Sequence, residues 1–229
     1  MWREVAMKRS STTLLICTLL MALSAIVASG QTPPSRSDTQ NWNDVFISVP
    51  VAGPVDFILQ GTLRNGRDLT RPVDERVGIG FSFRIGKYLT VIPNYLHIDM
   101  QPFAGRRVSE ERLSVNSTVK FSLGKFVLQN RHSFERRLRS PGIDTTRYRN
   151  RLQVDHPIGP AKKKISLFVS DEIFYDWSFN AWVRNRFAVG ASKVINKHFT
   201  LDLYYMRQND SHSVPGDLHI IGSTWRFKL

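Results

Sequence analysis

Residues 111–122 read ERLSVNSTVKFS, and polar and apolar side chains alternate along this stretch. The polar positions are Arg112, Ser114, Asn116, Thr118 and Lys120, and the apolar positions include Leu113, Val115, Val119 and Phe121. Successive side chains of a β-strand point to opposite faces, so this order predicts a strand with one polar face and one apolar face. A turn at 123–125 and a second alternating stretch at 126–137 follow at once. Together the two stretches predict a pair of neighbouring strands.

The same alternation continues through the rest of the chain and predicts an all-β protein. The predicted strands span 55–64, 73–85, 88–100, 111–122, 126–137, 146–158, 165–176, 180–194, 198–208 and 217–229. Residues 41–51 have the same pattern and would make the number of strands odd, whereas bacterial single-chain barrels have an even number. We therefore expect either ten strands with 41–51 outside the regular ladder, or twelve strands in which 41–51 pairs with another N-terminal segment.

The two faces of these strands indicate their surroundings. The polar face carries arginines in strand after strand and the acids Glu135, Asp155, Glu172 and Asp202. The apolar face carries Leu, Val, Ile and Phe, with Tyr and Trp near the strand ends, as a lipid-facing surface requires. Short connections such as 86–87 alternate with longer polar ones such as 101–110, as periplasmic turns and external loops do.

The sequence thus predicts a single antiparallel transmembrane β-barrel of about 10 to 12 strands in the outer membrane. A soluble lipocalin-like carrier is the alternative, in which the apolar face would lie inside and the charged face in water.

The N-terminal segment predicts export through a cleaved signal peptide. Arg3, Lys8 and Arg9 precede an uncharged apolar run at 14–28, and the small residues Ala28-Ser29-Gly30 follow it. This run is shorter than the ~20 apolar residues that a transmembrane helix needs. We therefore assign residues 1–30 to a signal peptide and 31–229 to the barrel. The chain has one Cys, Cys17, which lies in the signal, so the barrel would hold no disulfide and no cysteine chemistry.

The composition restricts the partners of the protein. Hydrophobic residues make up 41% of the chain, which excludes disorder, and 32 Lys and Arg against 19 Asp and Glu give a formal charge of +13. Such a charge favours nucleic acid or an anionic membrane surface as a partner. Because the basic residues alternate with apolar ones and follow a signal peptide, we predict no nucleic-acid binding. Arg106, Arg107, Arg136 and Arg137, near the bases of predicted loops, could instead meet lipopolysaccharide phosphates.

The last strand places Trp225, Phe227 and Leu229 on one face. This arrangement resembles the terminal strand signal that the barrel-assembly machinery reads in outer-membrane barrels, although Leu229 stands where Phe is usual. We expect that machinery, together with outer-membrane lipid and lipopolysaccharide, to be the partners.

Several short motifs connect the chain to a known family. They are Trp42, Arg149-Asn150-Arg151-Leu152, Ser170-Asp171-Glu172-Ile173-Phe174, Asn185-Arg186-Phe187 with Gly190, and Leu203-Tyr204-Tyr205-Met206. With them, about residues 40–229 resemble the bacterial outer-membrane family called domain of unknown function 2490. The resemblance implies a barrel in the outer membrane and implies no particular activity.

The lumen-facing arginines are the main candidate functional feature. The predicted ion-pair network comprises Arg131, Glu135, Arg149, Arg151, Glu172, Arg184 and Arg186. These side chains could form a bidentate ladder that stabilises a narrow barrel and plugs it. Alternatively, unpaired arginines in a water-filled bore would bind or select anions. We predict a structural, binding or narrow-pore protein, with the plug preferred.

Catalysis is the competing hypothesis. A lipid-modifying enzyme, a hydrolase or acyltransferase, would use a Ser nucleophile and a His base near the lipid-facing rim. His132 and Ser133 are adjacent, so they would point to opposite faces and could not share a proton. His212, between Ser211 and Ser213, lies in a predicted external loop. We assign no catalytic residue, no cofactor and no metal site, since His97, His156, His198 and His219 have no metal-binding spacing.

Overall fold

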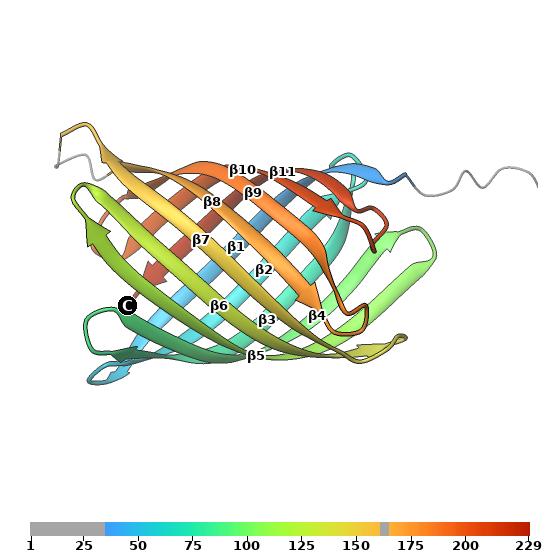
Figure 1. Cartoon of the computed structure of the whole chain (residues 1–229), viewed down its shortest axis with the longest axis horizontal. Helices are drawn as coiled ribbons and strands as arrows, with labels where there is room; N and C mark the ends of the chain where they lie inside the picture. The colour runs from blue at the N-terminus through green and yellow to red at the C-terminus, as the bar shows by residue number, and fades with distance from the viewer. Residues whose placement is uncertain (1–34, 161–164) are drawn as a thin grey trace, which may run out of the picture. The chain divides into compact units, whose positions relative to one another are not determined.

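The structure is a computed structural model that describes residues 35–160 and 165–229, and Ser35–Leu229 forms one compact unit. The predicted signal peptide lies outside the described residues. The described chain forms a closed barrel (Figure 1). Its eleven strands are β1 (Ser37–Ala52), β2 (Val55–Gly66), β3 (Arg71–Ile85), β4 (Leu89–Phe103), β5 (Arg106–Leu123), β6 (Phe126–Ser140), β7 (Thr145–Ile158), β8 (Ile165–Asp176), β9 (Ala181–Val194), β10 (Phe199–Asp210) and β11 (Asp217–Lys228). The predicted all-β barrel is confirmed.

The closure of the barrel differs from the prediction. Consecutive strands pair antiparallel, but β1 also pairs in parallel with β11, with Ser37 opposite Asp217 and Ser48 opposite Lys228. Residues 41–51 therefore lie inside β1 and take part in the ladder, and both the ten-strand and the twelve-strand expectations were wrong. A chain of consecutive hairpins with an odd number of strands starts and ends in the same direction, so it can close only through a parallel pair.

The connections at the two ends of the barrel are similarly short. The segments between strands contain two to six residues at either end, so the predicted difference between short turns and long loops was wrong. The clearest case is 101–110, where β4 and β5 extend into the predicted loop and leave a two-residue turn. Gly105 adopts φ +81° in this turn, a conformation that favours glycine. The strands thus extend farther toward the rim than the sequence indicated, and they carry additional inward-facing side chains there.

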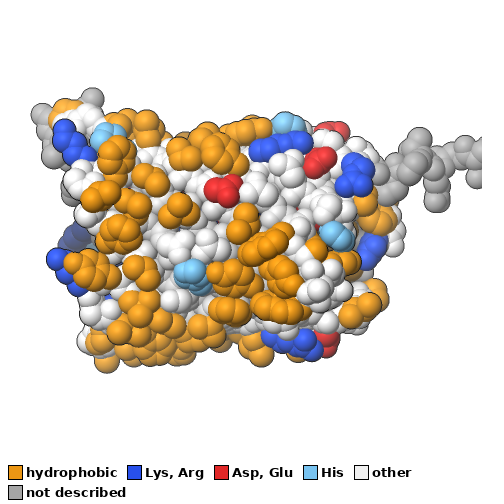
Figure 2. All heavy atoms as spheres, in the orientation of Figure 1, with side chains coloured by type: hydrophobic (Ala, Val, Ile, Leu, Met, Phe, Trp, Pro, Cys, Tyr) orange, Lys and Arg blue, Asp and Glu red, His pale blue; other side chains and the backbone are white. Residues whose placement is uncertain are grey.

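The barrel wall has the predicted two faces. Alternate residues point inward, where polar side chains prevail, and the outward positions form an apolar surface (Figure 2). Exposed outward side chains include Leu59, Val77, Ile79, Leu113, Val115, Leu152, Leu167, Val169, Val189, Leu203 and Ile221. Aromatic groups gather near the strand ends. The ring centroids of Tyr175 and Trp182 are 5.4 Å apart, and those of Phe199 and Phe227 are 4.9 Å apart. No helix in the described residues is long and apolar enough to cross a membrane.

Candidate functional site

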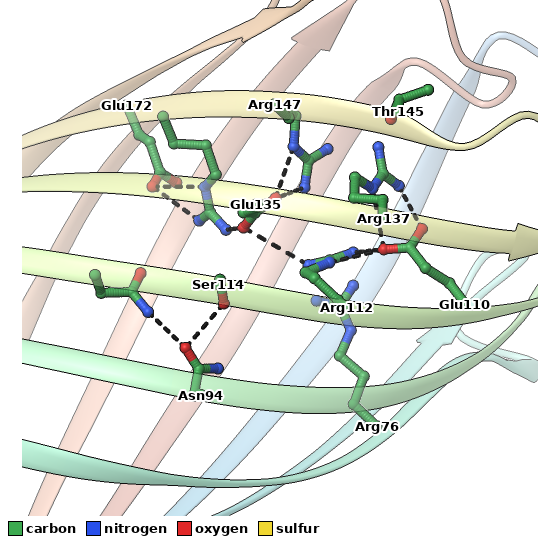
Figure 3. Close-up of polar contacts among 12 residues, drawn as sticks. Arg76, Asn94, Glu110, Arg112, Ser114, Glu135, Arg137, Thr145, Arg147 and Glu172 are labelled. Carbon is green, nitrogen blue, oxygen red and sulfur yellow. Dashed lines mark hydrogen bonds and ion pairs between the residues drawn. The ribbon is translucent and has the colours of Figure 1, made fainter.

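The inward faces of β5 to β8 bring three carboxylates and several arginines together in one half of the lumen (Figure 3). Glu110 on β5 is 0% exposed. Its Oε1 accepts a hydrogen bond from Nε of Arg112 at 2.7 Å, and its Oε2 accepts one from Nη2 of Arg137 at 2.7 Å and one from Nε of Arg139 at 3.2 Å. Because Glu110 and Arg112 are two residues apart on one strand, both side chains face inward and meet.

Glu135 on β6 is the central acceptor of the group. Its Oε2 accepts a bond from Nη2 of Arg147 at 2.6 Å, and its Oε1 accepts one from Nη1 of Arg149 at 2.7 Å. Arg112 lies 3.8 Å away, so this arginine faces both Glu110 and Glu135. Glu135 is 3% exposed. A carboxylate so far from water is tolerated because guanidinium groups satisfy both of its oxygens.

Glu172 on β8 extends the network to the next strands. Its Oε1 lies 2.6 Å from Nη2 of Arg131 and 2.8 Å from Nη2 of Arg149, and its Oε2 lies 3.9 Å from Nη1 of Arg186. Arg149 thus links Glu172 to Glu135. We call these three glutamates and the seven arginines that contact them the lumen cluster: Glu110, Arg112, Arg131, Glu135, Arg137, Arg139, Arg147, Arg149, Glu172 and Arg186. Asp176 on β8 adjoins the cluster, with Oδ2 3.9 Å from Nη1 of Arg137.

Two aromatic rings complete the cluster. The guanidinium of Arg64 lies 3.6 Å from the ring centroid of Trp42, and that of Arg186 lies 4.8 Å from it. Phe174 is 0% exposed and has four guanidinium groups within 5.4 Å of its ring, those of Arg147, Arg149, Arg184 and Arg186. Such cation–π contacts are strongest where the cation is desolvated. This half of the lumen is therefore filled by side chains that contact one another.

A cavity of about 550 Å³ occupies the other half of the lumen, toward the rim where β11 ends. It is lined by Phe46, Lys120, Val127, Gln129, Arg131, Arg151, Gln153, Asp155, Ser166, Phe168, Ser170, Ala188, Ser192, Asp202, Tyr204, Met206, Thr224 and Arg226. We call this cavity the vestibule. Arg131 belongs both to its lining and to the lumen cluster, so the cluster forms the inner end of the vestibule.

Residues 39–218 match the family described as Protein of unknown function (DUF2490). The chain belongs to this family. No curated protein matches the sequence.

Several solved bacterial proteins have a similar fold. They include an anion-selective porin from Comamonas acidovorans (11% identity, TM-score 0.41, 77% of this chain and 54% of the porin), the beta domain of the Bordetella autotransporter BrkA (12%, 0.44, 78% and 83%) and LpxR from Salmonella typhimurium (9%, 0.48, 80% and 86%). The chain thus spans about half the length of the porin.

The residues of the ion-pair network predicted from the sequence do not all lie in the lumen cluster. Arg131, Glu135, Arg149, Glu172 and Arg186 lie in the lumen cluster. Arg184 lies beside Phe174, but its ion pair is with Asp210. Arg151 points into the vestibule and makes no ion pair within residues 35–160 and 165–229. Arg137, expected on the outside near a loop, instead points inward to Glu110, because it shares a face with Glu135.

The ion-pair network predicted from the sequence lacks five members of the cluster: Glu110, Arg112, Arg137, Arg139 and Arg147. The alternation predicts Arg112 on a polar face, but it does not identify the acceptor of this arginine. Glu110 was placed in a loop, although Val108, Glu110 and Arg112 continue the alternation of the strand and are all buried. That continuation was the signal that could have found it.

The His and Ser candidates do not form a complete catalytic group. His132 lies on the outer face, with Nδ1 2.6 Å from the Tyr148 hydroxyl, whereas Ser133 faces inward, is 1% exposed and has no hydrogen-bond partner in the described chain. In the 211–216 turn, the Ser211 hydroxyl lies 2.7 Å from Nδ1 of His212. The carboxylate of Asp210 contacts Arg184 and the His212 backbone N–H rather than the imidazole.

Among residues 35–160 and 165–229, no group of three or more His, Asp or Glu side chains has the geometry to hold a metal ion. The terminal strand places Trp225 and Phe227 against the ring of Phe199, at centroid distances of 5.7 and 4.9 Å. Leu229 is exposed, and its backbone N–H donates to Ser48.

Proposed function

We propose that this protein is an outer-membrane β-barrel whose lumen is plugged, so that it acts as a structural or binding component of the membrane rather than as a continuous pore. The observation that carries the proposal is the lumen cluster, in which three buried carboxylates are joined by shared arginines across four neighbouring strands. A water-filled bore would instead solvate these groups individually.

Insertion in a lipid bilayer is supported by the outer face of the barrel. Strands of 12 to 18 residues are long enough to cross a hydrocarbon core, which needs about 9 to 11 tilted residues. The apolar outward positions lie on strand after strand, and a soluble lipocalin-like carrier would have to expose this surface to water. On this proposal residues 1–30 are removed during export, and the barrel-assembly machinery reads Trp225, Phe227 and Leu229 in the terminal strand.

Contact with lipopolysaccharide is a further part of the proposal. The side chain of Arg136 points outward near one rim and is 51% exposed, with Asp144 3.7 Å away. Arg106 and Arg107 are exposed at the turn between β4 and β5. Guanidinium groups at such positions can pair with lipid phosphates.

Planar-bilayer recordings on the refolded 31–229 chain test the plug. We expect no step-like conductance, while the same preparation migrates faster on gels before heating than after it, which reports a folded barrel. Reproducible single-channel steps from the folded protein would overturn the plugged lumen. Recovery of the exported chain as a soluble periplasmic monomer would overturn membrane insertion.

A lipid-modifying enzyme is a second candidate, favoured only by the contact between Ser211 and His212. Incubation of the refolded barrel with radiolabelled lipopolysaccharide or phospholipid tests it. Turnover that disappears in His212→Ala would support this function, and absence of turnover in the folded parent would remove it.

A further inference from the structure

The vestibule has an excess of positive charge. Four of its lining residues are cationic, Lys120, Arg131, Arg151 and Arg226, and two are acidic, Asp155 and Asp202. Asp202 accepts a hydrogen bond from Arg226 at 2.6 Å. Asp155 is held by side-chain amides, with Nε2 of Gln129 at 2.7 Å and Nε2 of Gln153 at 2.9 Å. The acids therefore leave part of the positive charge of this cavity without a partner.

Arg151 is the vestibule arginine that has no acidic partner among the described residues. In the strand register it lies opposite Arg131 on one side and Glu172 on the other. Glu172, however, directs Oε1 to Arg131 and Arg149, while Oε2 faces Arg186. Within the described residues, the Arg151 guanidinium makes no ion pair, and its buried Nε has no hydrogen-bond partner. The buried Nε of Arg131 likewise has none.

An uncompensated guanidinium beside another arginine is unfavourable for folding. The cost disappears when an acceptor enters from outside, and a planar guanidinium binds a carboxylate or phosphate through two parallel hydrogen bonds. The vestibule lining also offers aromatic surface from Phe46, Phe168 and Tyr204. The volume of about 550 Å³ falls within the usual range of small-molecule sites.

We propose that the vestibule binds a small organic anion, whose carboxylate or phosphate group is held by Arg151 with Arg131 and Arg226, and whose apolar body lies against the aromatic wall. This inference rests on the proposed plug, because the lumen cluster closes the inner end of the vestibule. A ligand then enters and leaves through the same rim, which makes the cavity a binding site rather than a conduction path.

Titration calorimetry on the refolded 31–229 barrel, at low salt in a zwitterionic detergent, tests the proposal. The probes are benzoate and phenyl phosphate, with neutral benzamide as the uncharged match and inorganic phosphate as the anion without an apolar body. We expect at least one aromatic anion to bind ten-fold or more tightly than benzamide and than inorganic phosphate. The tighter of benzoate and phenyl phosphate identifies the preferred anionic group.

Variants then locate the site. Arg151→Gln should lower the affinity for the bound anion ten-fold or more, and Arg151→Lys should retain part of it. Arg71→Gln, at the exposed start of β3 and outside the vestibule lining, should leave the affinity unchanged. Because Arg151 has no ion-pair partner among residues 35–160 and 165–229, Arg151→Gln should fold at least as well as the parent, as judged by heat-modifiable migration. Binding of both aromatic anions no tighter than benzamide, or unchanged binding in Arg151→Gln, would overturn the proposal. Conductance by the parent barrel would be a separate result, which overturns the plug whatever the calorimetry gives.

Discussion

Neutralising Glu135 should severely destabilise the barrel. Glu135 is 3% exposed and accepts hydrogen bonds from Arg147 and Arg149, with Arg112 3.8 Å away. In Glu135→Gln the amide cannot compensate these guanidinium groups, so several positive charges remain together away from water. Removing one partner of a buried ion pair costs about 3 to 5 kcal/mol. The lumen cluster contains seven arginines and three glutamates, and the adjoining Asp176 contacts Arg137 rather than Arg147 or Arg149, so the remaining acids cannot take over the lost role.

Asp202→Asn is the matched control for this change. Asp202 also pairs with an arginine in the lumen, and its own side chain is 12% exposed, but its partner Arg226 is 45% exposed in the vestibule. Water and salt screen such a pair, so its loss should cost about 1 kcal/mol or less. The two variants differ from the parent by the same loss of one negative charge.

Urea unfolding of the refolded proteins in lipid vesicles, followed by tryptophan fluorescence, measures both free energies of unfolding. We expect Glu135→Gln to lose at least about 2 kcal/mol more than Asp202→Asn, given the difference between buried and exposed pairs. If both variants lose only about 1 kcal/mol or less, water reaches Glu135 and the lumen is not plugged.

Two further predictions concern the faces of the wall. Val169→Arg places a charge on the lipid-facing side of β8 near the middle of the strand and should cost about 2 to 4 kcal/mol, whereas the neighbouring Ser170→Arg points into the lumen and should cost less. Equal folding yields in vesicles would contradict the assignment of the two faces. A Cβ at position 222 would overlap the ring of Tyr204, but one at position 61 would meet nothing within 4 Å. Gly222→Ala should therefore lower the urea midpoint and Gly61→Ala should not, and similar midpoints would argue against this packing.

The alternation of side chains predicted the two faces of the wall, because that pattern follows from strand geometry alone. It could not predict how the barrel closes, since a pattern with a period of two residues has no direction and gives the same signal for parallel and antiparallel neighbours. The polar residues at 101–110 suggested a loop, yet they continue two strands toward the rim. Polar side chains that face a lumen look like loop residues in the sequence.

The ion pairs could be predicted only in part. Alternation indicates that Glu172 and several arginines share the lumen, but the choice among Arg131, Arg149, Arg151 and Arg186 depends on side-chain rotamers and on the shear of the barrel. For the same reason Arg151 has no ion pair in the part of the chain that the structure describes, although it lies directly opposite Glu172 in the register. Only the three-dimensional structure shows which arginine has no ion-pair partner in the described residues, and hence where an anion could bind.

The parallel pair of β1 and β11 connects the closure of the barrel to the lumen cluster. Parallel pairing is slightly less stable per residue than antiparallel pairing, so a closing pair of this kind needs support from side chains. On the outer side, the Ser223 hydroxyl lies 2.7 Å from Oδ1 of Asn43 across the pair. On the inner side, Trp42 packs with Leu218 and Ile220 of β11.

The ring of Trp42 also carries the guanidinium groups of Arg64 and Arg186, and Arg186 faces Glu172. The side chain that packs across the parallel closing pair is therefore held in place by the charged groups at the centre of the lumen. A barrel that opened its lumen by dispersing this cluster would also remove support from its own closure. This coupling gives a physical reason for the lumen to remain filled, and it favours a plugged barrel with a one-ended binding cavity over a pore.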